Sequence, residues 1–338
     1  MGRKRILVTG GAGFIAHHAI DTILRETDWD IVSLDRLDYS GNLNRLNEVV
    51  MQHPAEERKR VKIVHHDLKA ELNPQICSAI GNIDIVAHMA AGSHVDRSID
   101  FPMEFVMDNV VGTVNILEFA RKQNNLEKFV YFSTDEVFGP APEGVKYKEN
   151  DRYNSTNPYS ASKAGGEELV VAYENTYKLP AIITHTMNVF GERQHPEKYI
   201  PMCIRKINVG DTVTVHSNSE KTKAGSRHYI HAKDVASALM FLVNYKGKLP
   251  NSETRCHKFN IVGSTELDNL ELAQYIASVQ GKSLNYEMVD FHSSRPGHDL
   301  RYALDGSKMK NMGWIPQPVN ARLAEVVSWT LSNNQWLM

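Results

Sequence analysis

Tyr159 and Lys163 are a pair of residues whose types and spacing could carry out chemistry. They lie four positions apart at the start of a predicted helix, so their side chains share one face of it. A tyrosine with an ordinary pKa of about 10 is a poor base at neutral pH. A lysine charge nearby stabilises the phenolate and lowers that pKa, which makes the pair a candidate proton acceptor.

Thr134, Asp135 and Glu136 form a second group, placed directly after a predicted strand at residues 128–133. In a doubly wound sheet the carboxyl ends of the strands face the ligand crevice. Two adjacent carboxyl groups there could serve as separate acid and base, if one has a raised pKa and the other stays ionised. The alternative is an Asp–Glu pair in a solvated turn.

A glycine-rich turn with Gly10 and Gly13 follows the apolar run at residues 5–9, and Phe14 and Ile15 open a helical pattern after it. Glycine lets the strand turn sharply and lets the backbone approach a pyrophosphate at the positive end of the helix. A strand before the turn and a helix after it strengthen this interpretation. The sequence therefore predicts a dinucleotide site here.

Asp35, at the end of the second predicted strand, completes the dinucleotide pattern. Its carboxylate would accept hydrogen bonds from the adenosine ribose and repel a 2′-phosphate, which favours NAD over NADP. The neighbouring Arg36 leaves NADP open, and a turn or helix-capping aspartate is the alternative role for Asp35. Four residues that follow later strands are expected beside the cofactor: Asp67 and Leu68 near the adenine, and Ala90 and Ala91 near the nicotinamide half.

Strands and helices alternate through residues 1–188. Several predicted strands are continuous Val/Ile runs, which is typical of strands covered on both faces. The predicted strands are residues 5–9, 30–34, 61–64, 83–88, 128–133 and 181–185, and helices are predicted at 109–122 and 160–177. This alternation predicts an α/β fold, a Rossmann-like domain with a doubly wound parallel sheet.

Residues 189–338 break this rhythm with prolines and shorter elements. One helix is well marked, because Asp268 and Glu271 form a capping-box pattern at its start and Gly281 follows its end. We predict a smaller, irregular α/β lobe that mainly binds the substrate. One or more of its strands could return to the large sheet.

The composition indicates an ordinary globular protein, in which 38 basic residues nearly balance 40 acidic ones. Neither nucleic acid nor an anionic membrane is therefore an expected partner. Three separated cysteines without CxxC spacing indicate neither a disulfide framework nor a metal site, and they fit a cytoplasmic setting. The apolar run after the basic N-terminal residues is too short for a signal peptide or a membrane span.

Longer runs of the sequence resemble the extended short-chain dehydrogenase/reductases, and within them the dTDP-glucose 4,6-dehydratases. The resemblance extends from Gly10 to about Trp314. Besides the residues above, it rests on the runs at 88–98, 132–139, 157–164, 196–201 and 295–302. Epimerases and decarboxylases of the superfamily share the glycine turn and the Tyr–Lys pair, but they usually lack the Thr-Asp-Glu run.

The resemblance implies a three-stage reaction on a nucleoside diphosphate glucose with tightly held NAD. Tyr159 would take the proton of the sugar 4-hydroxyl, whose oxygen Thr134 holds, while hydride leaves C4. Glu136 would then remove the C5 proton as Asp135 protonates the departing C6 hydroxyl. Hydride return to C6 gives a 4-keto-6-deoxy sugar. Tyr159 and Lys163 would also contact the cofactor.

Matching to the family also implies nine substrate-binding residues, among which cations and amides would hold the diphosphate. They are Ser93, Asn188, Glu197, Lys198, His216, Arg227, Asn260, Arg295 and His298. A solvated surface role is the alternative for several of them. The family further implies a homodimer in which helices 109–122 and 160–177 of two chains form a four-helix bundle.

The sequence departs from the family pattern at four places. Ala16 replaces the third glycine, Gly92 replaces a glutamate, and Glu192 follows Gly191 where Tyr-Gly-Pro is common. Residues 214–217 replace a Pro-Val-Tyr-Gly run, and the link from there to Arg227 is longer. This leaves dTDP and UDP unresolved, because the bases differ by one methyl, worth only about 1–3 kcal/mol in a pocket.

Three alternatives to a dTDP-glucose 4,6-dehydratase therefore stay open. UDP-glucose is the alternative substrate for the same reaction. A nucleotide-sugar 4-epimerase would need Tyr159 and Lys163, whereas Asp135 and Glu136 favour dehydration. A nucleotide-sensing or scaffold protein would need none of these four residues.

Overall fold

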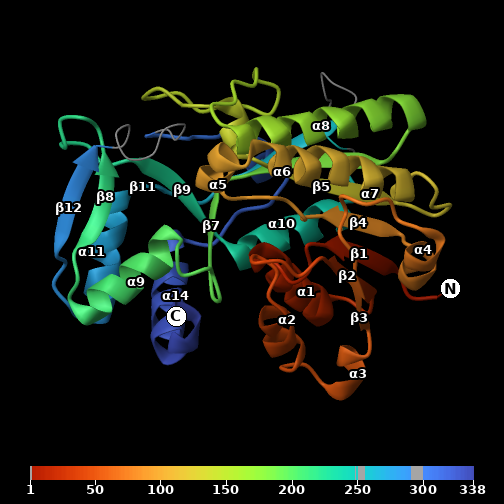
Figure 1. The fold of residues 1–338 in the computed structure, drawn as a ribbon, viewed down its shortest axis with the longest axis horizontal. Coiled ribbons are helices and arrows are strands. Elements are labelled where there is room, and N and C mark those ends of the chain that lie inside the picture. Colours follow the sequence, from red (N-terminus) through yellow and green to blue (C-terminus); the bar gives the residue numbers. More distant parts are fainter. Residues whose placement is uncertain (1, 248, 250–255, 291–299) are drawn as a thin grey trace.

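The computed structural model describes residues 2–247, 249, 256–290 and 300–338. Two lobes lie side by side in it (Figure 1). The larger lobe is built on a seven-stranded sheet, and the smaller one carries sheets of three and two strands. No helix in the described part of the chain is long and apolar enough to cross a membrane.

The large sheet is parallel throughout, with the strand order β10-β6-β5-β4-β1-β2-β3. Chain progression reverses between β1 and β4, and such sheets bind ligands at the carboxyl ends of the strands beside this switch point. The strands are β1 Arg5–Thr9, β2 Asp30–Asp35, β3 Val61–His65, β4 Ile85–His88, β5 Lys128–Thr134, β6 Ala181–Thr186 and β10 His257–Ile261.

The first six of these strands along the chain are the predicted ones, and the doubly wound fold is confirmed. The start of β4 differs most, because the two residues before it make other contacts. Asp84 Oδ2 accepts the backbone N–H of Arg5 at 2.7 Å, and the N–H of Ile83 donates to the side chain of Gln123 at 3.1 Å. The seventh strand, β10, comes from the second half of the chain.

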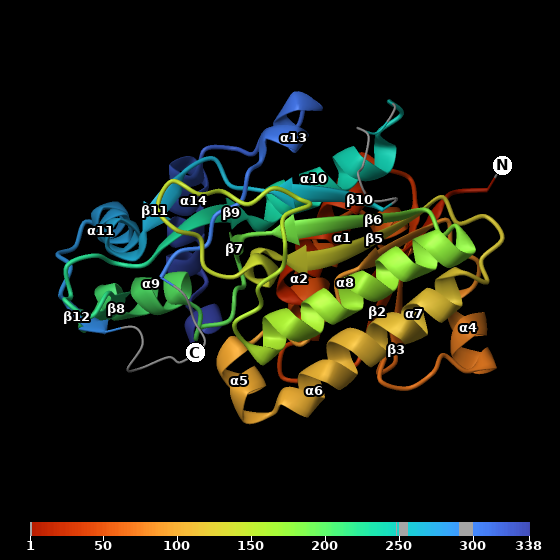
Figure 2. The ribbon, with the colours of Figure 1, turned by 90° about the horizontal axis from the view of Figure 1, so that it is seen from above.

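Helices cover both faces of the sheet, and the side chains of β1 alternate between two cores. Ile6 and Val8 pack with residues of α1 and α10, whereas Leu7 packs with residues of α7 and α8 on the other face (Figure 2). The helices of this lobe are α1 Phe14–Glu26, α2 Leu43–Val50, α3 Ala55–Arg58, α4 Pro74–Ile80, α5 Val95–Asp100, α6 Pro102–Val106, α7 Gly112–Ala120, α8 Pro158–Tyr177 and α10 Ala232–Asn244.

The helix predicted at residues 109–122 is wrong in its start and in its regularity. Helix begins already at Pro102, and a π-helical turn, Met107–Val111, separates α6 from α7. Such turns widen a helix locally and occur often at functional sites. Here Asp108 and Asn109, although adjacent in sequence, both point into the protein, with polar partners for each.

The smaller lobe has its own core between α9, α11, α14 and the strands β8 and β9. The predicted capping box of α11 is present, since Asp268 and Glu271 bond each other's backbone N–H groups, and Gly281 ends the helix at φ +62°. The elements outside the large lobe are β7 Asn188–Phe190, α9 Tyr199–Val209, β8 Val213–Ser217, β9 Ser226–His231, β11 Glu266–Asp268, α11 Asn269–Gln280, β12 Tyr286–Asp290 and α14 Val319–Ser332. The short helix α13 Ser307–Asn311 packs against β10 of the large sheet.

Candidate active site

The turn after β1 is so tightly packed that a side chain would clash at each of its three glycines. Gly10 has φ +68°, and a Cβ there would lie 2.9 Å from the Cα of Ala90, just beyond β4. A Cβ on Gly13 would lie 2.8 Å from the carbonyl oxygen of Gly10. The bare backbone of this turn lines a pocket, as close approach to a pyrophosphate requires.

The first turn of α1 supplies amide donors beside the same pocket. Gly13 is the N-cap residue, and no side-chain cap accepts from these amides in the described structure. Uncapped N–H groups and the helix dipole together favour an anionic ligand. The donors of this turn therefore fit the diphosphate of a dinucleotide.

Asp35 both holds the turn and faces the pocket. Its Oδ2 accepts the N–H of Ala12 at 3.0 Å, and its Oδ1 accepts the N–H of Leu37 at 2.8 Å. Burial raises the pKa of its carboxyl, and these two hydrogen bonds oppose that rise. Asp35 is thus a turn aspartate that also forms part of the pocket wall.

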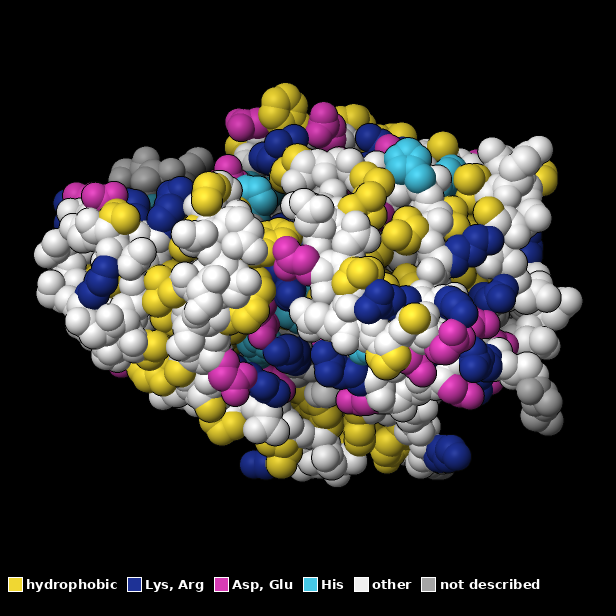
Figure 3. All heavy atoms as spheres, turned by 90° about the horizontal axis from the view of Figure 1, so that it is seen from below, with side chains coloured by type: hydrophobic (Ala, Val, Ile, Leu, Met, Phe, Trp, Pro, Cys, Tyr) yellow, Lys and Arg dark blue, Asp and Glu magenta, His cyan; other side chains and the backbone are white. Residues whose placement is uncertain are grey.

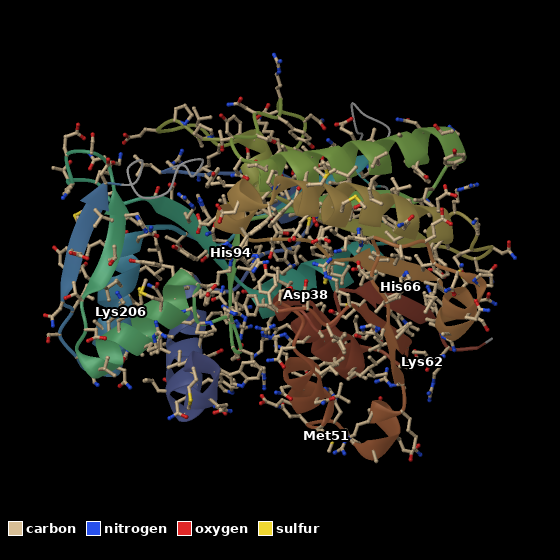
Figure 4. The ribbon with its side chains drawn as sticks, viewed as in Figure 1. Asp38, Met51, Lys62, His66, His94 and Lys206 are labelled. Atoms are coloured by element: carbon tan, nitrogen blue, oxygen red, sulfur yellow. The ribbon has the colours of Figure 1, made fainter. Side chains whose placement is uncertain are left out.

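The predicted cofactor residues at the strand ends come together around this one pocket. Its lining includes Gly10, Gly13, Phe14, Ile15, Asp35, Asp67, Leu68, Ala90 and Ala91. Asp38, His66 and His94 also line it, from the loops after β2, β3 and β4 (Figure 4). These three residues are not among the predicted site residues, although their positions shortly after strands are a signal for them.

The candidate catalytic carboxyls lie where β5 passes into one turn of 3₁₀-helix, Asp135–Phe138. Thr134, the last residue of β5, accepts the N–H of Glu136 on its Oγ1 at 3.3 Å. The same hydroxyl donates to Asp135 Oδ1 at 3.1 Å. The turn ends at Gly139, whose φ of +73° favours glycine. Strand end and cap together fix both carboxyls at the ligand edge of the sheet.

Asp135 is buried in a way that suits a proton donor. The residue is only 3% exposed, and its Oδ2 has no hydrogen-bond partner among the described residues. Burial, and then the charge of Glu136, raise the pKa of Asp135 to about 7. A carboxyl with this pKa carries a proton for much of the time at neutral pH.

Glu136 has a different environment, although it is the next residue. It is partly exposed, and its Oε2 accepts a hydrogen bond from the amide of Asn157 at 3.1 Å. A hydrogen bond to the carboxylate favours the charged form, which is what a proton acceptor needs. Asn157 lies in the run at 157–164 that resembles the family, but it is not among the predicted site residues. The structure adds it as a residue that orients Glu136.

Tyr159 and Lys163 lie in the first two turns of α8, next to these carboxyls. Asn157 caps the helix through the N–H of Ser160, and the N–H of Tyr159 donates to Ser98 Oγ at 3.1 Å. Lys163 is 3% exposed, with its Nζ 4.3 Å from the centre of the Tyr131 ring. Neither residue lines the dinucleotide pocket itself, which ends at Phe132 on β5.

The lowering of the Tyr159 pKa that we predict from Lys163 together with the positive ring of NAD does not occur in the protein alone. Burial, and then the negative charge of Glu136, raise the pKa of Tyr159 above its ordinary value. Burial also lowers the pKa of Lys163 to about 7, so its positive charge is only partly present at neutral pH. The phenolate therefore requires a further positive charge in the site.

Charged and histidine side chains gather between the two lobes (Figure 3), and three of the predicted substrate residues line the pocket. Ser93, Glu197 and Lys198 line the cofactor pocket on the side of the smaller lobe, together with Gln194 and His195. Asn188 is exposed in β7 and His216 is partly buried in β8. Arg295 and His298 lie outside the described residues.

Arg227, in β9, lies in the wall between the lobes and is 8% exposed. Its Nη1 donates to the carbonyl oxygens of Ser226 and Leu300, both at 2.7 Å, and its guanidinium lies 4.5 Å from the centre of the Tyr302 ring. The positive charge of Arg227 lowers the pKa of Asp135, against the effect of burial. This arginine therefore connects the substrate side of the cleft electrostatically with the catalytic turn.

Asn260 does not join the other predicted substrate residues. It is fully buried in β10, and its Nδ2 donates to the carbonyl oxygens of Tyr147 and Asp305 at 3.0 and 3.1 Å. Its Oδ1 lies 3.0 Å from His185 Nδ1. With both ends of the amide bonded inside the protein, its position indicates a structural role in the edge of the large sheet.

Comparison with known proteins agrees with this geometry. The sequence profile of the GDP-mannose 4,6 dehydratase family matches residues 7–326. The chain is 36% identical to a dTDP-glucose 4,6-dehydratase of Escherichia coli, a match that spans 98% of this chain and 95% of that protein. The chain belongs to the GDP-mannose 4,6-dehydratase family.

Relatives within this family differ in the nucleotide that their names specify. A trifunctional UDP-glucose 4,6-dehydratase, 3,5-epimerase and reductase of Arabidopsis thaliana is 35% identical over 98% of this chain and 48% of its own length. The crystal structure of DesIV, a dTDP-glucose 4,6-dehydratase of Streptomyces venezuelae with NAD bound, has a TM-score of 0.84. It is 32% identical, and the match spans 98% of both chains.

The structure explains why the usual glutamate of the family is absent at Gly92. A Cβ there would lie 3.1 Å from the Phe105 ring and 3.2 Å from Asp108 Oδ2. Asn109 also bonds both the N–H and the carbonyl of Gly92 through its side-chain amide. Phe105 of α6 and Asp108 of the π-helical turn therefore crowd the space that a side chain at position 92 would need.

Proposed function

We propose that this chain is an NAD-dependent nucleotide-sugar 4,6-dehydratase that forms a 4-keto-6-deoxy sugar from a nucleoside diphosphate glucose. The observation that carries the proposal is the carboxyl pair after β5. Asp135 has a raised pKa of about 7, whereas Glu136 is more exposed and hydrogen-bonded to Asn157. An acid and a base side by side suit the removal of water, which a 4-epimerase does not perform.

In the first stage the sugar is oxidised at C4. NAD, when bound, supplies the hydride acceptor and later donor, and its positive ring favours the tyrosine phenolate. Tyr159 takes the proton of the 4-hydroxyl, and Thr134 Oγ1 holds the same oxygen. Lys163 adds positive charge to the extent that it is protonated, which its pKa of about 7 allows at neutral pH and below.

In the second stage water is lost between C5 and C6. The C4 ketone acidifies the C5 proton, and Glu136 accepts that proton. Asp135 gives its own proton to the C6 hydroxyl, so a water molecule leaves and a C5–C6 double bond forms. Return of hydride to C6 and of the proton from Glu136 to C5 completes the 4-keto-6-deoxy sugar. Tyr159 then gives its proton to solvent and Asp135 takes one up, which restores both groups. The only net change is the loss of water and the internal oxidation–reduction of the sugar.

We propose dTDP-glucose as the substrate, with UDP-glucose as the alternative. The E. coli and Streptomyces relatives support the first, and the Arabidopsis relative supports the second at nearly the same identity. The test is turnover of each nucleotide sugar at equal low concentration, followed by mass spectrometry. A product lighter by one water supports dehydration, and the faster substrate identifies the nucleotide. A product of unchanged mass would instead establish an epimerase.

We also propose that the enzyme is a cytoplasmic homodimer with a four-helix bundle at its interface. Its three cysteines are free thiols, as in a reducing compartment. Leu117 and Val170, two of the apolar residues on the predicted bundle helices, are fully buried against the sheet. Phe101, Met103 and Val106, by contrast, are 53%, 68% and 40% exposed in and beside α6. These exposed apolar side chains precede the predicted bundle helix 109–122 and would add apolar surface beside the proposed interface.

A further inference from the structure

Arg36 is the residue that makes the choice between NAD and NADP ambiguous, because an arginine near the ribose-binding acid can hold a 2′-phosphate. In the structure its guanidinium is surrounded by carboxylates. Both Nη atoms donate to the two oxygens of Asp108, with Nη2 and Oδ2 2.9 Å apart. Nε donates to Asp38 Oδ2 at 2.7 Å, and the same oxygen lies 2.5 Å from Nη2. Nη1 lies 3.7 Å from Asp67 Oδ1.

Asp108 is held in this position by its surroundings. It lies in the π-helical turn, and its side chain is only 9% exposed. Gly92 leaves the room that the carboxylate needs, because a Cβ on that residue would lie 3.2 Å from Asp108 Oδ2. The bidentate pair therefore joins the loop after β2 to the helix behind the pocket.

The chemistry of this cluster opposes a 2′-phosphate in two ways. A guanidinium binds phosphate through a planar fork of two N–H groups, and Asp108 already occupies the fork formed by the two Nη atoms. Asp35, Asp38, Asp67 and Asp108 also place four carboxylates around one arginine. A phosphate that brings about two more negative charges would meet net repulsion there.

We propose that Asp108 is a cofactor-selectivity residue, which keeps Arg36 from binding a 2′-phosphate and so maintains the preference for NAD. The inference rests on the proposed function, because it requires a dinucleotide in this pocket. The selection of NAD over NADP, which the sequence suggests only through Asp35, would then also depend on a residue of the π-helical turn. Removing the Asp108 carboxylate should free Nη1 and leave Nη2 with one carboxylate in place of two, so that the guanidinium can turn towards the pocket, while Asp38 still contacts Nε and Nη2.

The test is a competition between the two dinucleotides. The full-length protein is incubated to equilibrium with equal concentrations of NAD and NADP, separated by gel filtration, and its bound nucleotides are quantified by mass spectrometry. The wild type should retain NAD almost alone. Asp108→Ala should raise the bound NADP-to-NAD ratio by at least about tenfold, the effect of one charge-assisted contact. Asp108→Asn, which keeps the shape of the side chain, should shift the ratio less in the same direction.

Two control variants separate this role from a general effect on the fold. Arg36→Ala in the Asp108→Ala background should remove the gain in NADP. Glu104→Ala removes an exposed carboxylate one turn earlier, which forms no ion pair with Arg36 in the described structure, and should leave the ratio as in the wild type. Retained NAD with an unchanged ratio in Asp108→Ala would overturn this inference alone. A wild type that binds neither dinucleotide would overturn the proposed function as well.

Discussion

At the scale of single residues, the burial that suits Asp135 to donate a proton also destabilises the folded protein. Its pKa is about 7 when folded and about 3.9 in an unfolded chain. The folded state thus binds this proton more tightly than the unfolded chain does. Protonation of Asp135 therefore favours the folded state, and this contribution to stability is fully present below about pH 4. It is lost as the pH rises towards 7. Above pH 7 the buried charge opposes folding.

We therefore expect Asp135→Asn to stabilise the protein while it slows dehydration. The gain should approach an upper limit of about 4 kcal/mol above pH 7, at about 1.4 kcal/mol for each pKa unit, and should be smaller at pH 5. Urea unfolding of both proteins at pH 5 and pH 8 measures it. An equal difference in unfolding free energy at the two pH values would contradict the raised pKa.

Glu136→Gln should stop the reaction after oxidation of the sugar. The amide cannot take the C5 proton, so the reduced nicotinamide should accumulate in a fast phase after mixing with dTDP-glucose or UDP-glucose. Its absorbance in a stopped-flow measurement checks this, and turnover should fall by about 10²–10⁴-fold. Glu143→Gln, at a side chain that is 87% exposed, should behave like the wild type. The role assigned to Glu136 would not survive normal turnover without such a phase.

At the scale of elements, the sequence predicts whatever depends on local pattern. Val/Ile runs locate six strands, and the capping residues locate α11 to within a residue. Deviations arise where distant residues intervene. The start of β4 is changed because Asp84 and Ile83 bond to Arg5 and Gln123, which are far away in the sequence.

In the candidate site, too, features that depend on local pattern are predictable and those that depend on distant residues are not. Glycines and acids at strand ends are predictable, because parallel strands bring their carboxyl ends to one edge. The pKa of Tyr159 is not predictable from the sequence, since it depends on burial and on how Glu136 lies relative to Tyr159. Asn260 matches a family pattern, yet its amide bonds Tyr147 and Asp305, which only the folded chain brings to it.

At the scale of the whole molecule, both lobes contribute residues to the pocket. The large sheet positions the dinucleotide turn and the candidate catalytic carboxyls, whereas Lys198, the N-cap residue of α9, lines the pocket from the smaller lobe. The charge of Arg227 acts on Asp135 across this boundary. Substrate binding between the lobes would therefore affect the proton donor directly.

The exposed apolar side chains of α6 lie on the outside of the large lobe, and they lead to a prediction about how two copies of the chain pair. The wild type should sediment as a dimer of the 38.1 kDa chain. Met103→Glu together with Val106→Glu should produce a folded monomer, because pairing would bury unpaired charges at the interface. Met51→Glu is the matched control, since Met51 is 60% exposed at the opposite side of the large lobe (Figure 4). Analytical ultracentrifugation of the three proteins decides the matter: a monomeric wild type, or a double variant that stays dimeric, would exclude this face as the interface.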